Sequence, residues 1–134
     1  MNWYNKNKKT IEIGFLGESK IRDILKSKKM KFMQVDVMFK NHKNKWCLGE
    51  VKTQERFLAP PFDGHGLPEW QIKTRIEFYN ETGIEPYLFI YELNTENIYY
   101  NSLLELTKKE SFKTNGKSPR TIFNLNNFKQ IKHE

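Results

Sequence analysis

The chain has 134 residues, of which 37% are hydrophobic and 14% aromatic, enough for one globular domain with a modest core rather than a disordered chain. Its formal net charge is +7, and its one cysteine, Cys47, excludes an internal disulfide and a cysteine-rich zinc site. We therefore expect a single domain over residues 1–134.

Targeting signals are not visible in this sequence. The first ten residues are polar and basic and lack the apolar core of a secretory signal. No segment approaches the roughly 20 apolar residues that a membrane span requires. A cytoplasmic protein without a membrane partner is the expectation.

Residues 10–28 are predicted to form a helix, with Thr10 as the N-cap and lysines near the C-terminal end. At 100° per residue, its apolar residues form one stripe, and Glu18 falls in the middle of it. A core-facing glutamate is costly unless it is paired, hydrogen-bonded or bound to a metal. Glu18 is thus either a functional carboxylate or, after a small rotation of the helix, a solvent-exposed residue.

Two strands follow, over residues 31–39 and 46–53, and the polar residues 41–44 between them suit a hairpin turn. Side chains alternate along a strand, so Glu50 and Lys52 share one face while Cys47 lies on the other as a buried, inert thiol. Folding the hairpin brings Asp36 opposite Gly49 or Glu50, with facing Cβ atoms ~4.5–5.5 Å apart.

Two carboxylates and an ammonium group on one patch of sheet suggest phosphodiester hydrolysis. Asp36 and Glu50 provide the oxygen ligands that Mg²⁺ prefers, and Lys52 can orient an attacking water or steady charge on a phosphate. The alternative is an ordinary exposed sheet face, where cross-strand charge pairs contribute ~0.2–1 kcal/mol. The apolar neighbours of Glu50 on this face favour a partly buried cleft.

The charge is unevenly distributed along the chain. Residues 1–45 hold twelve Lys/Arg and four Asp/Glu, a net charge of +8. Residues 46–100 hold four Lys/Arg and nine Asp/Glu, a net charge of −5, and residues 101–134 hold seven Lys/Arg and three Asp/Glu, a net charge of +4. A basic segment beside an acidic one is what a nuclease needs, although such lysines can also serve solubility alone. The candidate phosphate contacts are Lys6, Lys8, Lys9, Lys26, Lys28, Lys29, Lys31, Lys43 and Lys45.

Residues 56–66 carry two prolines and three glycines or aspartates around His65, and we expect an irregular segment whose first residues, 56–58, can extend or neighbour the sheet. His65, between two glycines, could contact substrate, ligate a metal or transfer protons. Without a second histidine at ligand spacing a transition-metal site is not expected, so we favour a flexible loop near the cleft.

The second half of the chain predicts further α/β structure. A helix is expected from Pro68 to Thr82, ended by Gly83, with Gln71 and Arg75 forming a polar stripe. Strands are expected over residues 87–92 and 97–101, a short helix after the capping box Ser102–Glu105, and a final strand over residues 121–125.

The order of helix with Glu18, strand with Asp36, strand with Glu50-Val51-Lys52, helix with Gln71 and strand resembles the PD-(D/E)XK nuclease superfamily over residues 10–92. The resemblance implies an α/β fold with a restriction-endonuclease-like αβββαβ core, in which helices flank a mixed central sheet, plus a small C-terminal extension. It also implies catalytic roles for Glu18, Asp36, Glu50, Lys52 and Gln71. The implied metal ligands are Asp36, Glu50, Val51 and Glu18, binding Mg²⁺, with Mn²⁺ also supporting activity. The strict proline of the motif is replaced by Val35.

Within that superfamily the chain is most similar to small Holliday-junction resolvases of the archaeal and RecU types, through Gly17-Glu18, Arg56-Phe57-Leu58, Trp70-Gln71 and residues 118–122. This resemblance implies a homodimer that cuts four-way or other branched DNA in recombination or repair. Arg56, His65 and Arg75 join Lys6, Lys8, Lys9, Lys28, Lys29, Lys43 and Lys45 as expected nucleic-acid contacts. No counterpart of the RecU junction-inserting stalk is found. A restriction-like or phage-encoded nuclease, or an inactive nucleic-acid-binding module, are the alternatives.

Overall fold

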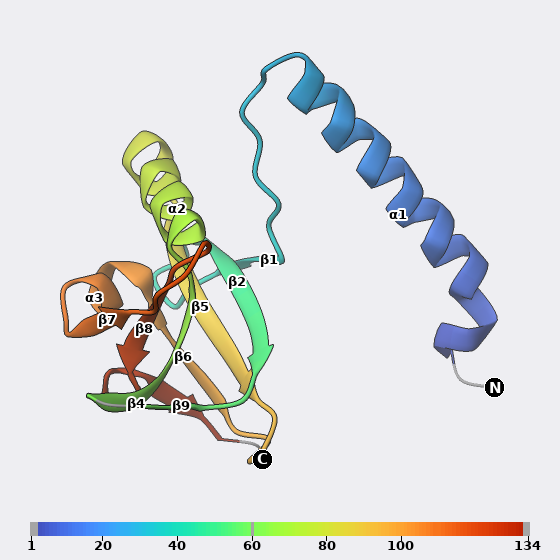
Figure 1. Ribbon diagram of the computed structural model, residues 1–134. Coiled ribbons are helices and arrows are strands. Elements are labelled where there is room, and N and C mark those ends of the chain that lie inside the picture. The colour runs from blue at the N-terminus through green and yellow to red at the C-terminus, as the bar shows by residue number, and fades with distance from the viewer. Residues whose placement is uncertain (1–2, 60, 133–134) are drawn as a thin grey trace. The chain divides into compact units, whose positions relative to one another are not determined.

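The structure is a computed structural model that describes residues 3–59 and 61–132, with side chains for residues 8–58 and 61–132 (Figure 1). It contains two compact units, Met1–Gln34 and Val35–Glu134, and each is described by itself. A single folding domain over the whole chain stays a prediction. No helix among the described residues is long and apolar enough to cross a membrane.

The first unit is built on one helix, α1 (Trp3–Ser27). The predicted N-cap at Thr10 is wrong, because α1 begins seven residues earlier and continues through Thr10. No glycine or proline interrupts residues 3–10, so nothing in this stretch ends the helix. At the other end Lys29 has a φ of 57°, and Met30 N–H donates to Leu25 O at 2.9 Å, which closes the last turn.

The second unit contains a five-stranded mixed sheet in the order β1-β2-β5-β6-β9. Its strands are β1 (Val37–Lys40), β2 (Trp46–Gln54), β5 (Glu85–Glu92), β6 (Ile98–Ser102) and β9 (Lys129–Ile131). β2 and β5 are parallel and lie side by side in Figure 1, and the other pairs are antiparallel. The expected α/β class with a mixed sheet flanked by helices is confirmed.

The strand predicted over residues 31–39 is much shorter than expected. β1 begins only at Val37, opposite Gly49, and Asp36 lies in a bend before it. The backbone of Asp36 does not pair with β2. Its side chain accepts the Val51 N–H of β2 instead. The hairpin itself is confirmed: the turn after β1 is held by Asn41 Oδ1, which accepts the N–H groups of Lys43 and Lys45.

A second, four-stranded sheet was not predicted. It has the order β3-β4-β8-β7 and consists of β3 (Phe57–Ala59), β4 (Phe62–Pro68), β8 (Arg120–Asn124) and β7 (Ser111–Lys113). The irregular segment expected over residues 56–66 is therefore wrong. Gly64 and Gly66 are needed in β4 because a Cβ on either would overlap with a carbonyl oxygen of the neighbouring strand β8.

The remaining elements lie close to their predicted positions. α2 (Glu69–Thr82) starts after Pro68 and ends at Gly83, whose φ of 76° is the left-handed conformation that glycine adopts easily. α3 (Leu103–Thr107) is capped by Ser102 Oγ, which accepts the Leu104 N–H. β8 is not the final strand, because η1 (Leu125–Asn127) and β9 follow it.

The hydrophobic core lies on one face of the five-stranded sheet. α2 and α3 pack there together with β4 and β8. The buried residues of this cluster are Leu67, Ile72, Leu88, Ile90, Tyr99, Leu103, Leu106, Phe123 and Phe128. Because Leu88 and Ile90 are the β5 partners of Glu50 and Lys52, these two polar residues point to the core side of β2.

A buried carboxylate, Glu92, joins the two sheets at the end of β5. Glu92 is fully buried. Its carboxylate accepts hydrogen bonds from Arg56 Nε at 3.1 Å and Nη2 at 2.9 Å, from Thr95 Oγ1 at 2.7 Å and from His65 Nε2 at 2.6 Å. Burial by itself raises the pKa of Glu92, but the hydrogen bonds from Arg56, Thr95 and His65 outweigh it and lower the pKa to about 2. The carboxylate is thus held ionised inside the protein.

His65, from β4, is also fully buried, and both of its ring nitrogens face oxygen atoms. Nδ1 lies 3.0 Å from Gln54 Oε1 and Nε2 lies 2.6 Å from Glu92 Oε2. The Gln54 amide is oriented by two further bonds with the Gly66 backbone, so Oε1 is the atom that meets the ring. Burial lowers the pKa of His65 and Glu92 acts against this. The net effect holds the pKa of His65 below its ordinary value, and Nε2 is the ring nitrogen that donates, because the ionised Glu92 carboxylate can only accept.

The lowered pKa of Glu92 makes stability depend on pH. The folded-state pKa of about 2 lies below the ordinary value of 4.5, so the stabilisation is complete above pH 4.5 and is lost as the pH falls towards 2. The loss is expected to be on the order of 3 kcal/mol. Urea unfolding between pH 6 and pH 2 measures it. Glu92→Gln should flatten the profile in this window, whereas Glu81→Gln, on the exposed side of α2, should keep the parental slope.

Candidate functional site

Asp36 is tied to the strand that carries the motif. Its Oδ2 accepts the backbone N–H of Val51 at 2.8 Å, across the hairpin from β2. β1 begins only at Val37, so the edge of β2 beyond Gly49 is open to the side chain of the preceding residue. The hydrogen bond places an exposed carboxylate next to the Glu50-Val51-Lys52 segment, as the hairpin prediction requires.

Glu50 is a buried carboxylate, with its side chain only 6% exposed. Its Oε2 accepts from Arg75 Nε at 3.2 Å and Nη2 at 2.7 Å, and its Oε1 lies 3.4 Å from Lys52 Nζ. Arg75 reaches it from α2 and is 4% exposed, while Lys52 is 24% exposed. A buried pair of this kind is stable only while both charges are present.

Gln71 lies one helical turn before Arg75, and the two side chains share one side of α2. Its Oε1 is buried and has no hydrogen-bond partner among the described residues. A buried acceptor without a donor costs free energy, so this oxygen is available to a water, a substrate group or a cation. The expected stripe of Gln71 and Arg75 therefore faces the motif strand, since Arg75 contacts Glu50.

The oxygen atoms of this region are of the chemical type that binds a divalent cation. Asp36 and Glu50 offer carboxylate oxygens, Val51 a backbone carbonyl and Gln71 an amide oxygen with no other partner, all of them hard donors of the type that Mg²⁺ accepts. Arg75 and Lys52 compete for Glu50. Among the described residues no group of three or more His, Cys, Asp or Glu side chains is already gathered for a metal.

Glu18 belongs to the first unit, where it lies in helix α1, and is described there by itself. Within that unit it is a surface residue, with its side chain 64% exposed and its carboxylate 3.9 Å from Arg22 Nη1. The core-facing position predicted for it is not found in its own unit. Its role as a metal ligand or catalytic carboxylate stays a prediction.

The basic residues expected to contact nucleic acid fall into two groups. Lys8, Lys9, Lys28 and Lys29 are exposed in the first unit, and Lys43 and Lys45 are exposed at the β1–β2 turn of the second. Lys6 lies outside the residues whose side chains the structure describes. All six described lysines are accessible to a polyanion.

Three other residues expected to contact nucleic acid are engaged by carboxylates: His65 and Arg75 are buried, whereas a contact through Arg56, with its side chain 28% exposed, stays a prediction. His65 is 0% exposed in strand β4 rather than on a flexible loop. Arg75 is buried against Glu50, and Arg56 is bound bidentately to Glu92. The three positions have a common physical cause: each side chain hydrogen-bonds to a carboxylate that the core could not otherwise hold.

Sequence reasoning missed Glu92 and the role of Arg75 in holding Glu50. The partners are 27 residues apart for His65 and Glu92 and 25 apart for Arg75 and Glu50. One signal was present: Glu92 alternates with Leu88 and Ile90 on the core face of a strand, where an acidic residue needs a cationic partner.

Comparisons with protein-family models, with curated proteins and with solved structures find no match to this chain.

The Glu50–Arg75 pair should dominate the stability of this region. Arg75→Ala leaves Glu50 buried beside a single, more exposed lysine, so we expect a loss of about 3–5 kcal/mol in the free energy of unfolding. Urea unfolding at pH 7 measures it. Lys73→Ala, which removes an exposed cation from the same helix, should cost less than about 1 kcal/mol. Equal stability of the two variants would contradict this account of Glu50.

Proposed function

We propose that this protein is a divalent-cation-dependent nuclease of the PD-(D/E)XK kind that hydrolyses phosphodiester bonds in DNA. The observation that carries the proposal is the Asp36–Val51 hydrogen bond, which joins an exposed carboxylate to the strand bearing Glu50 and Lys52. The parallel β2–β5 pair, connected through the helix that bears Gln71, supports a restriction-endonuclease-like core.

The proposed chemistry assigns each side chain a distinct task. Asp36, Glu50, the Val51 carbonyl and Gln71 would hold Mg²⁺ or Mn²⁺, which supplies a Lewis acid for the phosphate when bound. Lys52 is the partly exposed cation of the set, with its Nζ 3.4 Å from Glu50 Oε1. From there its ammonium can meet negative charge that grows on the phosphate during reaction.

Arg75 gives the site a resting state. Its guanidinium neutralises Glu50 through Nε and Nη2 in a buried contact. Cation binding at Glu50 then requires that Arg75 release part of this carboxylate. This competition makes the affinity of the site for a metal ion depend on the strength of the Arg75–Glu50 ion pair.

The substrate proposed is branched DNA, such as a four-way junction. A resolvase makes two symmetric cuts, so this part of the proposal includes a homodimer with paired active sites. The exposed lysines of both units supply charge for phosphate contacts. A nuclease acting on another DNA substrate would keep the same site and dispense with the symmetry.

A second candidate is a nucleic-acid-binding module without catalysis. One observation favours it: both oxygens of Glu50 are already engaged by cationic side chains. In that case the ion pair is structural, and Asp36 serves only to end β1 on the edge of β2. The experiments below separate the two candidates.

Lys52→Ala should reduce DNA cleavage by at least about a hundredfold while leaving DNA affinity within a few-fold, because one of many positive charges is lost. Supercoiled plasmid and a labelled four-way junction, each with Mg²⁺ or EDTA, are the substrates. Lys52→Arg should not restore activity, since a planar guanidinium does not replace a compact ammonium. Lys73→Ala is the matched control. Cleavage by Lys52→Ala at the parental rate would exclude the proposed centre.

Arg75→Ala also tests whether Glu50 binds metal. Removing Arg75 frees Glu50, so Mg²⁺ at a hundred times the variant's dissociation constant should stabilise the variant by about 2.7 kcal/mol and should stabilise the parent less. Thermal unfolding with and without Mg²⁺ measures the difference. Arg75→Ala combined with Glu50→Gln should lose the response. A shift of equal size in all three proteins would instead favour the binding-module candidate.

A further inference from the structure

The face of the five-stranded sheet opposite the core carries a continuous group of aromatic side chains. Register places them: Phe89 pairs with Tyr100, Tyr87 with Ser102, and Phe39 with Cys47, all on the side away from Glu50. All four aromatic residues, Phe39, Tyr87, Phe89 and Tyr100, are half-buried, so each ring keeps an accessible part. We call these four residues the aromatic face.

The rings of the aromatic face form one connected set. Phe89 lies at the centre, with ring centroids 5.6 Å from Phe39, 6.3 Å from Tyr87 and 6.0 Å from Tyr100. The planes of Phe89 and Tyr100 are inclined by only 20°, and those of Tyr87 and Phe89 by 25°. Three neighbouring rings on two strands therefore present nearly the same orientation.

Gly49 allows the central ring to lie across the adjacent strand. A Cβ on Gly49 would come within 2.9 Å of Phe89 Cε2 and 2.5 Å of Val37 Cγ2. The absence of that Cβ leaves room for the Phe89 ring over the backbone of β2. The Phe89 ring therefore reaches across to β2 and meets Phe39 edge to face.

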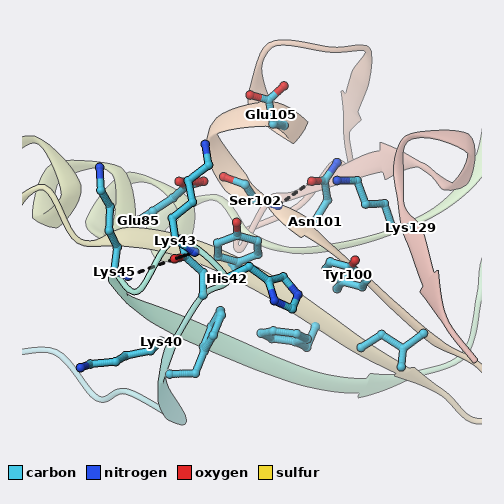
Figure 2. A pocket seen from close by; sticks show the side chains of 15 residues that line it. Lys40, His42, Lys43, Lys45, Glu85, Tyr100, Asn101, Ser102, Glu105 and Lys129 are labelled. Carbon is cyan, nitrogen blue, oxygen red and sulfur yellow. Dashed lines mark hydrogen bonds between the residues drawn. The ribbon is translucent and has the colours of Figure 1, made fainter. Parts of the chain in front are cut away.

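A groove of about 860 Å³ runs along this face (Figure 2). Lysines from two separate segments line it: Lys43 and Lys45 from the β1–β2 turn, and Lys129 from β9, where it is the direct partner of Tyr100. Four lysines and two glutamates, Glu85 and Glu105, are among the lining residues, which leaves a positive balance. The fourth, Lys40, directs its ammonium to the Trp46 ring at 5.4 Å.

From these contacts we infer that the aromatic face binds single-stranded nucleic acid, with bases stacked on the rings of Phe89, Tyr100 and Tyr87 and phosphates near Lys43, Lys45 and Lys129. Every base has a π-face, and an aromatic platform beside positive charge suits unpaired nucleotides. A duplex hides its base faces in the stack and cannot use such a platform. The ligand is therefore an unpaired segment of DNA or RNA.

This site is distinct from the proposed nuclease centre. Glu50 and Lys52 point to the core side of β2, whereas the aromatic face is on the other side of the same sheet. The inference does not need catalysis: it holds for the nuclease and for the binding module alike. Binding measured in EDTA tests it separately from cleavage.

The test uses the full-length protein and a fluorescein-labelled twenty-nucleotide oligothymidine, with the matching duplex for comparison, in EDTA. The parent should bind the single strand more tightly than the duplex. Phe89→Leu and Tyr100→Leu should each weaken single-strand binding by about fivefold or more. Phe89→Tyr and Tyr100→Phe keep a ring and should retain binding, which also guards against misfolding as the cause. Phe112→Leu, in the other sheet, is the control and should bind like the parent.

Two further readouts decide the outcome. An oligonucleotide containing 2-aminopurine should change its fluorescence on binding, and Lys129→Ala should lower the salt slope by about 0.7, whereas Lys117→Ala should not. Equal affinity for single strand and duplex, or unchanged binding by both leucine variants, would overturn the inference. So would a change in oligomeric state by Tyr100→Leu without any oligonucleotide binding, which would assign the face to a second copy of the chain.

Discussion

The ionised Glu92 carboxylate, buried where the two sheets meet, is the constraint on which the second unit depends. Four atoms of Arg56, Thr95 and His65 donate hydrogen bonds to it, and these three residues come from three different segments. An ionised group in an apolar environment is tolerated only when it is paired and hydrogen-bonded, so β4, β5 and the link after β2 must take these positions together. The charge network orders the link between the sheets.

The same principle acts at Glu50, with a different consequence. Here the carboxylate meets Arg75 on its buried side and Lys52 on its more exposed side. A structural ion pair and a metal ligand require opposite things of a glutamate: the first needs a fixed cation, the second a carboxylate free to bind one. In the proposed nuclease a divalent cation would bind Glu50 in place of Arg75, which reconciles the two requirements.

The two faces of the five-stranded sheet divide the proposed tasks. The core face carries Glu50 and Lys52 beside Leu88 and Ile90, and the opposite face carries the aromatic rings. Strand alternation makes this separation automatic, because neighbouring residues such as Lys52 and Val51 must point to opposite sides. A protein with this arrangement could hold an unpaired segment on one side of the sheet and perform chemistry on the other.

Local patterns in the sequence were sufficient for much of the second unit. Alternation located β2, an apolar run located β5, Gly83 marked the end of α2, and Ser102 marked the start of α3. Each of these signals acts within a few residues. The hairpin that brings Asp36 to Val51 also followed from strand and turn signals. The placement of Glu50 and Lys52 on one face of β2 needed only the strand period.

Tertiary structure alone decided the partners of the charged residues and the second sheet. Gly64 and Gly66 suggested a loop, but they serve the close approach of β8, a strand far along the chain. His65 and Arg75 were expected to be accessible to nucleic acid, yet each is buried against a carboxylate on another element. No local period encodes such pairings, because the free energy of a buried charge depends on what the whole fold brings within hydrogen-bond distance.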